Sequence, residues 1–308
     1  MKALVIGGNG FIGSHLVDQL ILDGSEVVIL DVIERRYDPM PAEAQFIQGE
    51  LSQAYLLREA LTGVDVVFHL AWTTVHETAN QDPSADVTAN LIPSIHLFEA
   101  CLRSGVKRVV FTSSGGTVYG RAATIPIKES HPKNPLNSYG ITKLCVEKYL
   151  YMFGRLYGLD YAVLRPSVPY GPRQNPLGLQ GAASIFLYRV SRNLPIKIWG
   201  DGSITRDYFY ISDLTTALGK AARTSLKDDR IFNIGGSEAI TLKELLTEVE
   251  NIVGKSAQVV NELPRDFDAD QIVLDTSLAA EILDWKPAID LKEGLSKTWS
   301  WMCSNVPL

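Results

Sequence analysis

The chain has 308 residues, of which 46% are hydrophobic and 21% are charged, and its formal net charge is −6. This is the composition of a globular protein, and the length corresponds to about two domains at roughly 150 residues each. This composition excludes a disordered chain, a collagen and a disulfide-stabilised miniprotein. The negative net charge and the absence of any basic block argue against nucleic acid or an anionic membrane as a partner.

Signals for membranes, export and metal binding are missing from the sequence. No apolar run reaches the roughly 18 residues that a membrane span needs, and MKALVIGGNG lacks the h-region of a signal peptide. Cys101, Cys145 and Cys303 are an odd number and widely spaced, with no CxxC pair. We therefore expect a cytoplasmic protein with no membrane segment, no structural disulfide and no metal site.

The first half of the chain alternates short apolar runs with amphipathic stretches. The runs are rich in β-branched residues and nearly continuous in hydrophobicity, which is typical of parallel strands covered on both faces. The predicted strands are Ala3–Ile6, Val27–Leu30, Val64–Leu70, Val106–Thr112 and Tyr161–Arg165, and the predicted helices between them include Gly13–Leu22, Gln53–Leu61 and Leu91–Leu102. This alternation predicts an α/β fold with a doubly wound parallel sheet (Rossmann type) over residues 1–165, whose loops meet at the carboxyl edge.

The second half, residues 166–308, is predicted to form a smaller C-terminal α/β lobe. Residues Pro166–Pro176 carry four prolines, so we expect no regular element there. Thr241 and Glu244 form a capping-box pattern that opens a helix, and Gly254 closes it. One strand, Arg230–Ile234, is a candidate for return to the main sheet, which would interleave the two domains.

A glycine-rich segment, Gly7–Gly13 (GGNGFIG), lies between the first predicted strand and the first predicted helix. Glycines allow a tight turn and a close backbone approach to a pyrophosphate, and the helix N-terminus presents free N–H groups to it. Asp31 ends the second strand, where a carboxylate accepts hydrogen bonds from both ribose hydroxyls and repels a 2′-phosphate. The pattern predicts NAD, while Arg35 and Arg36 keep NADP open. The alternative is a turn that binds no ligand.

Tyr139 and Lys143 are four residues apart in a predicted helix and therefore share one face, one turn apart. Lowering the pKa of a phenol from about 10 by about 3 units takes about 4 kcal/mol. An ammonium about 4 Å away, at an effective dielectric constant near 20, supplies about that much. The spacing thus predicts that Lys143 makes Tyr139 a general base, the alternative being an ordinary exposed pair. Hydroxyls of the upstream segment Thr112–Gly120 are placed to relay the proton.

Together these segments resemble the extended short-chain dehydrogenase/reductase family, in particular its UDP-glucose 4-epimerase-like branch. The likeness spans nearly the whole chain. The motifs that carry it are VIGGNGFIGSHL with the strand-end Asp31, FHLA (68–71), SSGGTVYG (113–120), SYGITK (138–143), YGPRQ (170–174), RDYFYISDL (206–214), FNIGG (232–236) and PRDFD (264–268).

The resemblance implies a role for each matching position. Tyr139 would be the base, Lys143 would hold Tyr139 and the nicotinamide ribose, and Ser114 or Thr117 would be the hydroxyl partner. The implied NAD contacts are Gly7, Gly10, Phe11, Ile12, Gly13, Asp31, Glu50, Leu51, Leu70, Ala71, Asn90, Ser113, Tyr139 and Lys143. The implied nucleotide-sugar contacts are Arg206 and Arg265, which would clamp the diphosphate, with Trp199 and Val168. The alternative for the two arginines is a surface salt bridge with Asp207 or Asp268.

Four positions depart from the family pattern. Counted back from VYG, Gly115 stands where the catalytic Ser or Thr is usual, so the hydroxyl must come from a neighbour. Val168 replaces an Asn that contacts the sugar nucleotide, and Glu50 replaces an Asp. Trp72 follows FHLA where a small residue is common, and would crowd the nicotinamide side of the pocket. These departures leave the particular sugar open.

The resemblance implies a nucleotide-sugar 4-epimerase, with a UDP-hexose as substrate and NAD retained through each cycle. The alternative is an NAD(P)-dependent reductase of a 4-keto-6-deoxy nucleotide sugar; the absence of an acidic pair at Gly115–Gly116 argues against dehydration. A protein that only binds a dinucleotide is a third hypothesis, which the presence of Tyr139 and Lys143 argues against. By analogy with the family, helices 91–102 and 139–156 would pair in a homodimer.

Overall fold

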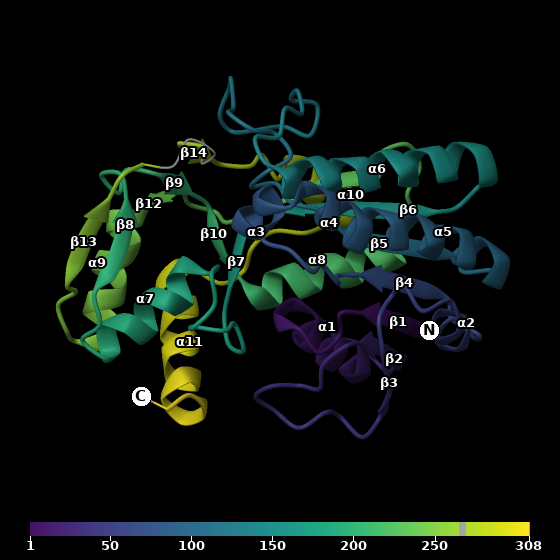
Figure 1. Ribbon diagram of the computed structural model, residues 1–308, viewed down its shortest axis with the longest axis horizontal. Coiled ribbons are helices and arrows are strands. Elements are labelled where there is room, and N and C mark those ends of the chain that lie inside the picture. The colour runs from purple at the N-terminus through teal and green to yellow at the C-terminus, as the bar shows by residue number, and fades with distance from the viewer. Residues whose placement is uncertain (265–268, 308) are drawn as a thin grey trace.

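The structure is a computed structural model that describes residues 1–264 and 269–307. Its centre is a parallel sheet of seven strands in the order β11-β6-β5-β4-β1-β2-β3 (Figure 1). The strands are β1 (Lys2–Ile6), β2 (Glu26–Asp31), β3 (Ala44–Gln48), β4 (Val66–His69), β5 (Arg108–Thr112), β6 (Tyr161–Pro166) and β11 (Ile231–Ile234). All five predicted strands are present, which confirms the doubly wound sheet.

Helices cover both faces of this sheet, because its buried strands are apolar on both sides. Leu4 and Ile6 of β1 pack into one core with α2, α5 and α6, and Ala3 and Val5 pack into the other with α1 and α8 (Figure 1). These helices are α1 (Phe11–Leu22), α2 (Ala54–Ala60), α5 (Ile92–Ser104), α6 (Ser138–Tyr157) and α8 (Ile211–Arg223). Among the described residues, no helix combines the length and apolarity that crossing a bilayer requires.

The segment after β4 is helical but irregular. It contains α3 (His76–Gln81), α4 (Pro83–Asp86) and a π-helical turn, η1 (Val87–Leu91), which runs directly into α5. The predicted helix Leu91–Leu102 is therefore the continuation of a longer helical segment. Single π-helical turns often mark functional positions, and this one carries Asn90.

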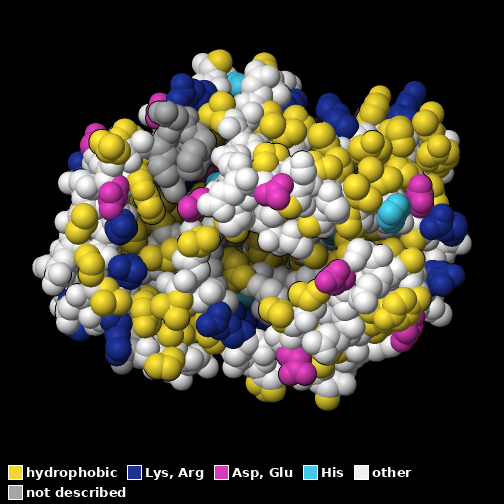
Figure 2. Space-filling model, viewed as in Figure 1, with side chains coloured by type: hydrophobic (Ala, Val, Ile, Leu, Met, Phe, Trp, Pro, Cys, Tyr) yellow, Lys and Arg dark blue, Asp and Glu magenta, His cyan; other side chains and the backbone are white. Residues whose placement is uncertain are grey.

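The C-terminal lobe, over its described residues, is built from short strands and helices. Its strand pairs are β7 (Val168–Tyr170) with β10 (Tyr208–Tyr210) and β8 (Ile196–Trp199) with β13 (Val259–Glu262). A small sheet joins β12 (Ile240–Thr241), β9 (Thr205–Arg206) and β14 (Gln271–Ile272). The helices are α7 (Ala182–Ser191), α9 (Leu242–Val253), α10 (Ser277–Leu283) and α11 (Leu291–Asn305). Figure 2 shows a hollow between this lobe and the layers of the main sheet.

Two predictions for this half are confirmed at the level of elements. Thr241 Oγ1 accepts from the Glu244 N–H at 3.1 Å and Glu244 Oε2 accepts from the Thr241 N–H at 2.7 Å, so α9 opens with the predicted capping box. Strand β11 pairs with β6 in the main sheet, so the two halves of the chain are interleaved there.

Two other features differ from expectation. Strand β3 forms an edge of the main sheet, although the sequence pattern predicted no strand there. The expectation of no regular element in Pro166–Pro176 is wrong, since β6 includes Pro166 and β7 includes Pro169. Strand β7 pairs with β10 only and therefore has an open edge. Proline is tolerated in such edge strands, because the N–H group that it lacks is not needed on the unpaired side.

Candidate active site

The glycine-rich segment forms a tight cradle at the carboxyl edge of β1. Gly7 has φ +81°, and a Cβ there would lie 2.7 Å from the backbone N of Ala71, the residue that follows FHL. A Cβ on Gly13 would lie 2.1 Å from the Gly7 carbonyl oxygen. Helix α1 begins at Phe11 after the N-cap Gly10, which has no side chain to cover the helix N-terminus. No side chain caps the first turn, so the backbone N–H groups of Phe11 and Ile12 are available to an anion; their contact with a pyrophosphate stays a prediction.

Asp31 stands beside this cradle, at the end of β2. Its carboxylate accepts from the Asn9 N–H at 2.9 Å and from the Ile33 N–H at 3.2 Å. The Arg35 guanidinium turns away from that position, donating to the Ser14 carbonyl at 3.0 Å and pairing with Asp18 at 2.8 Å. A carboxylate at the strand end and an arginine engaged elsewhere fit the ribose hydroxyls of NAD better than the phosphate of NADP.

The remaining predicted cofactor residues fall into two groups. Leu70 and Ala71 both donate their N–H groups to the Ile6 carbonyl, which places them directly beside the glycine cradle. Glu50 and Leu51 lie beyond β3, with Glu50 exposed and accepting from the Ser52 hydroxyl at 3.0 Å. Contact of these residues with NAD stays a prediction.

Asn90 and Ser113 are buried and engaged by the protein itself. The Asn90 amide oxygen accepts from the Thr73 N–H at 2.9 Å and from its hydroxyl at 3.1 Å, while its NH₂ donates to the Asp86 carboxylate at 2.9 Å. The Ser113 hydroxyl donates to Glu147 at 2.5 Å. These bonds use both acceptor sites of the Asn90 oxygen and hold the residue in place beside the cleft; contact of Asn90 and Ser113 with NAD stays a prediction.

Tyr139 and Lys143 lie on one face of α6, as predicted. The Lys143 ammonium donates to the carbonyl of Thr112, at the carboxyl end of β5, at 2.7 Å, and lies 5.7 Å from the centre of the Tyr139 ring. Since β5, β4 and β1 are neighbours in the sheet, this bond brings the pair to the edge that carries the glycine cradle.

The electrostatics of this pair differ from expectation. Burial raises the pKa of Tyr139 above its usual value, and the Asp86 carboxylate acts in the same direction. Burial lowers the pKa of Lys143 to about 7, against the opposing effect of the Glu147 and Asp86 carboxylates. The expected lowering of the Tyr139 pKa by Lys143 is therefore not found: burial dominates the shift, and the ammonium bonds to the Thr112 carbonyl.

The hydroxyl candidates lie in the loop after β5. Thr117 Oγ1 is buried without a hydrogen-bond partner among the described residues, and the Thr117 Cβ is 3.1 Å from where a Gly140 Cβ would stand. Thr117 thus packs against the residue next to Tyr139. Ser114 is half-buried, one residue before Gly115. An unpartnered buried hydroxyl is costly unless a ligand completes it, which favours Thr117 over Ser114.

Asp86 is a fully buried carboxylate beside this site that is not among the residues predicted from the sequence. One oxygen accepts from the Thr74 hydroxyl and Asn90, and the other accepts from Ser138 at 2.9 Å and Thr142 at 2.7 Å. Asp86 therefore ties the loop after β4 to the first turn of α6. The only sequence signal was its spacing of four from Asn90.

A second buried acid, Glu147, lies one turn beyond Lys143 on α6. It forms an ion pair with Arg165 on β6, with Nε to Oε1 at 2.9 Å, and Arg165 also donates to the Tyr119 hydroxyl at 2.8 Å. Tyr119 in turn donates to Asn233 on β11 at 2.6 Å. This network fixes α6 against β6 and β11, and thereby fixes the height of Lys143 above the sheet.

The predicted substrate residues lie in the C-terminal lobe. The Arg206 guanidinium donates to the carbonyls of Thr205 and Ala269, each at 2.8 Å. Val168 is half-buried on β7, and Trp199 ends β8 at 36% exposure. Arg265 lies outside the described residues. Binding of a nucleotide sugar by these residues stays a prediction.

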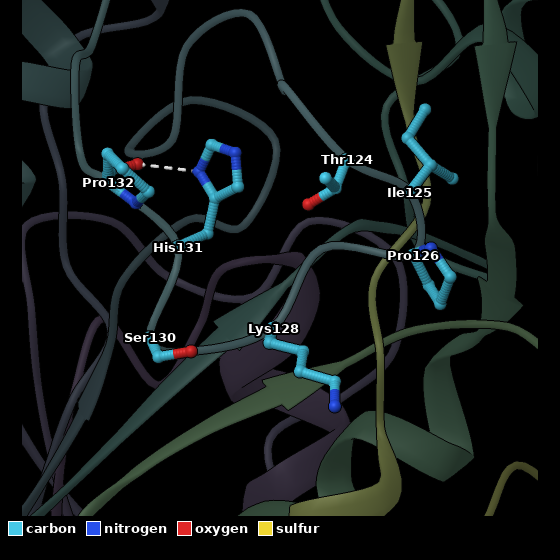
Figure 3. Close-up of a pocket in the computed structure, with 7 residues that line it drawn as sticks. All are labelled: Thr124, Ile125, Pro126, Lys128, Ser130, His131 and Pro132. Carbon is cyan, nitrogen blue, oxygen red and sulfur yellow. Dashed lines mark hydrogen bonds between the residues drawn. The ribbon is translucent and has the colours of Figure 1, made fainter.

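A separate cavity of about 470 Å³ lies in the loop before α6 (Figure 3). His131 lies in its wall and donates from Nδ1 to the Pro132 carbonyl at 2.7 Å, while its Nε2 accepts from the Ala123 N–H at 3.1 Å. None of the predicted site residues lines this cavity, so it plays no part in the candidate site. Over the described ranges, no three or more His, Cys, Asp or Glu residues are grouped as metal ligands.

Comparison with known proteins bears on this geometry. The model of the NAD-dependent epimerase/dehydratase family matches residues 3–235. The chain is 36% identical over 304 residues to a putative UDP-glucose 4-epimerase of Methanocaldococcus jannaschii, covering 98% of each. It is 32% identical to a dTDP-4-dehydro-6-deoxyglucose reductase of Escherichia coli, covering 96% of this chain and 95% of that protein.

Two crystal structures share the whole fold. The UDP-glucose 4-epimerase of Thermotoga maritima with UDP-glucose superposes with a TM-score of 0.94 at 35% identity, covering 99% of each chain. The UDP-glucose 4-epimerase of Thermus thermophilus in complex with NAD gives a TM-score of 0.92 at 33% identity, covering 99% of this chain and 100% of the other.

Proposed function

The chain belongs to the NAD-dependent epimerase/dehydratase family, and we propose on that basis that it is a 4-epimerase of UDP-hexoses with Tyr139 as the catalytic base. The observation that carries the proposal is a single juxtaposition. The bond from Lys143 to the Thr112 carbonyl brings the Tyr139–Lys143 pair to the sheet edge that also carries the glycine cradle and Asp31. In parallel α/β sheets this edge is where dinucleotides bind.

The residues at this edge fit NAD, and each has a separate task. We assign the pyrophosphate to the turn of Gly7, Gly10 and Gly13 beside the first turn of α1, and the ribose hydroxyls to Asp31 at the end of β2. When bound, NAD⁺ supplies a reversible hydride acceptor for C4 of the sugar, a redox capacity that no side chain of this protein offers.

The protein itself manages the proton of the sugar C4 hydroxyl. Tyr139 accepts this proton while the 4-keto sugar exists and returns it afterwards, with Thr117 as the hydroxyl that bonds to the sugar oxygen. Because burial raises the pKa of Tyr139, its phenolate needs a compensating positive charge, which the nearby Lys143 ammonium supplies while it remains protonated. The 4-keto sugar must rotate in the pocket so that hydride returns to its opposite face. It needs a tether while it rotates, a role that we assign to binding of the diphosphate by Arg206.

A purified protein tests this assignment directly. An epimerase retains NAD and interconverts UDP-glucose and UDP-galactose with no added cofactor, whereas a 4-keto-6-deoxysugar reductase consumes added NADH or NADPH stoichiometrically. Tyr139→Phe keeps the ring and is expected to lose at least about 10²-fold in kcat while still binding NAD. Full activity of Tyr139→Phe would remove the assignment of Tyr139 as the base. Absence of both epimerisation and NAD(P)H oxidation by the native protein would favour a protein that only binds a dinucleotide.

We also propose that the enzyme forms a homodimer and that it is located in a reducing compartment. Helices α5 and α6 carry exposed apolar side chains of the kind that a partner helix covers: Ile92, Ile141, Tyr151, Leu156 and Tyr157. All three cysteines are free, in keeping with a reducing cytoplasm. Light scattering after size-exclusion chromatography tests the dimer, and Tyr151→Glu with Leu156→Glu is expected to give monomers.

A further inference from the structure

Trp72 lies in the loop between β4 and α3 and contacts the catalytic pair directly. The centre of its ring is 3.8 Å from the Lys143 nitrogen, so the ammonium sits against the indole face. The same indole meets Tyr139 edge-on, with ring centres 5.9 Å apart, and lies 6.2 Å from the ring of Phe111 on β5. A position expected to crowd the cofactor therefore carries a side chain that packs on the catalytic lysine.

The Lys143 ammonium has exchanged most of its hydration for these contacts. The residue is 3% exposed, and its nitrogen donates to the Thr112 carbonyl at 2.7 Å while lying 4.8 Å from the centre of the Phe111 ring. Three aromatic rings and one carbonyl thus surround the charge, the Tyr139 ring being the most distant of the three at 5.7 Å. Cation–π attraction is strongest for Trp and increases when water is excluded.

We propose that Trp72 is a positioning residue that holds the Lys143 ammonium, charged, beside Tyr139 through the face of its indole. The charged groups that face Lys143 are Glu147 on its own helix and Asp86 on α4, and His69 on β4 and Tyr139 are the titratable groups nearby. Both carboxylates favour the protonated lysine, and burial opposes it. The indole adds to the favourable side without adding a titrating group of its own.

Two substitutions at residue 72, whose new side chains are apolar and similar in size to each other, distinguish the electrostatic effect of the ring face from its packing. Trp72→Leu keeps an apolar side chain and removes the aromatic face, while Trp72→Phe retains a weaker face. The readout is the titration midpoint of the Lys143 nitrogen, followed by NMR in protein labelled with ¹⁵Nζ-lysine. Loss of the resonance in Lys143→Met assigns it.

We expect the midpoint of Lys143 to fall by about one pH unit in Trp72→Leu, a roughly tenfold loss of proton affinity, and by much less in Trp72→Phe. An unchanged midpoint, a midpoint that rises, or equal shifts in the two variants would each overturn the proposal. This readout needs no turnover, so it stands or falls separately from the proposed function.

Fluorinated tryptophan provides a second measurement that leaves the fold unchanged. Fluorine withdraws electron density from the ring face, so 5-fluoro- and then tetrafluoro-tryptophan should lower the midpoint stepwise. The chain has 5 tryptophans, and Trp72→Phe labelled in the same way is the matched control for the others. The part of Trp72 in the reaction rests on the proposed function. If Lys143 acts there as an ammonium, the alkaline limb of the pH profile of kcat/KM should shift together with the titration midpoint of Lys143. A midpoint shift without a change in that limb would leave Trp72 a lysine partner and refute its part in the reaction.

Discussion

Gly115→Ser is the most informative single substitution, because it puts a hydroxyl where related enzymes usually carry one. From the sequence alone the change looks like a restoration. In the structure a Cβ at residue 115 would lie 2.8 Å from the Arg165 carbonyl oxygen and 2.5 Å from Leu274 Cδ1. We expect the substitution to destabilise the protein and to lower activity instead of raising it.

The magnitude follows from which neighbour is able to move. Leu274 contributes the end of a flexible side chain, so it shifts at small cost. The Arg165 carbonyl belongs to β6, and its residue is held by the buried ion pair with Glu147 at 2.9 Å, so the backbone must bend as a unit. Overpacking of this kind costs typically about 1–3 kcal/mol, and we expect the upper part of that range. For a chain of 308 residues this corresponds to roughly 3–5 °C in Tm.

The assay compares thermal unfolding and epimerase activity of Gly115→Ser with those of Gly116→Ser. At residue 116 a Cβ meets nothing closer than 3.8 Å, so the neighbouring serine tests the hydroxyl without the steric clash. Equal stability of the two variants, or higher activity in Gly115→Ser than in the native enzyme, would refute the steric reasoning and return the catalytic hydroxyl to position 115.

The remaining predictions concern the cradle and two buried acids. Gly13→Ala places a Cβ 2.1 Å from the Gly7 carbonyl oxygen and should weaken NAD binding at least about tenfold by calorimetry; unchanged affinity would contradict the cradle. Burial raises the pKa of Asp207 to about 7, so the folded protein binds this proton more tightly than the unfolded chain, and stability falls as pH rises from about 4 to 7. Asp207→Asn should remove about 2 kcal/mol of the difference in unfolding free energy between pH 5 and pH 7, measured in urea, and an unaltered difference would exclude Asp207 as its source. Asp86→Asn should cost about 2–4 kcal/mol of stability and lower the pKa of Lys143 below about 7, because a carboxylate that accepts four hydrogen bonds is lost; a higher Lys143 midpoint would reverse the assigned sign.

Several features of this protein were determined by short-range sequence patterns. The buried strands, the glycine cradle before α1, Asp31 at the end of β2 and the capping box at Thr241 all appear where the sequence predicts them. Each depends on residues a few positions apart, whose local geometry the chain imposes on itself. The shared face of Tyr139 and Lys143 belongs to the same class, since a spacing of four defines a helix face.

What the tertiary structure decided involves segments that are distant in sequence. Asp86 reaches Thr142 across 56 positions, and the Trp72 indole, from the loop after β4, meets Lys143 on α6. Leu274, from the C-terminal lobe, closes the space beside Gly115. The protonation of Lys143 and Tyr139 depends on the same encounters, because burial depends on which segments cover a side chain, and spacing along the chain carries no information about that cover.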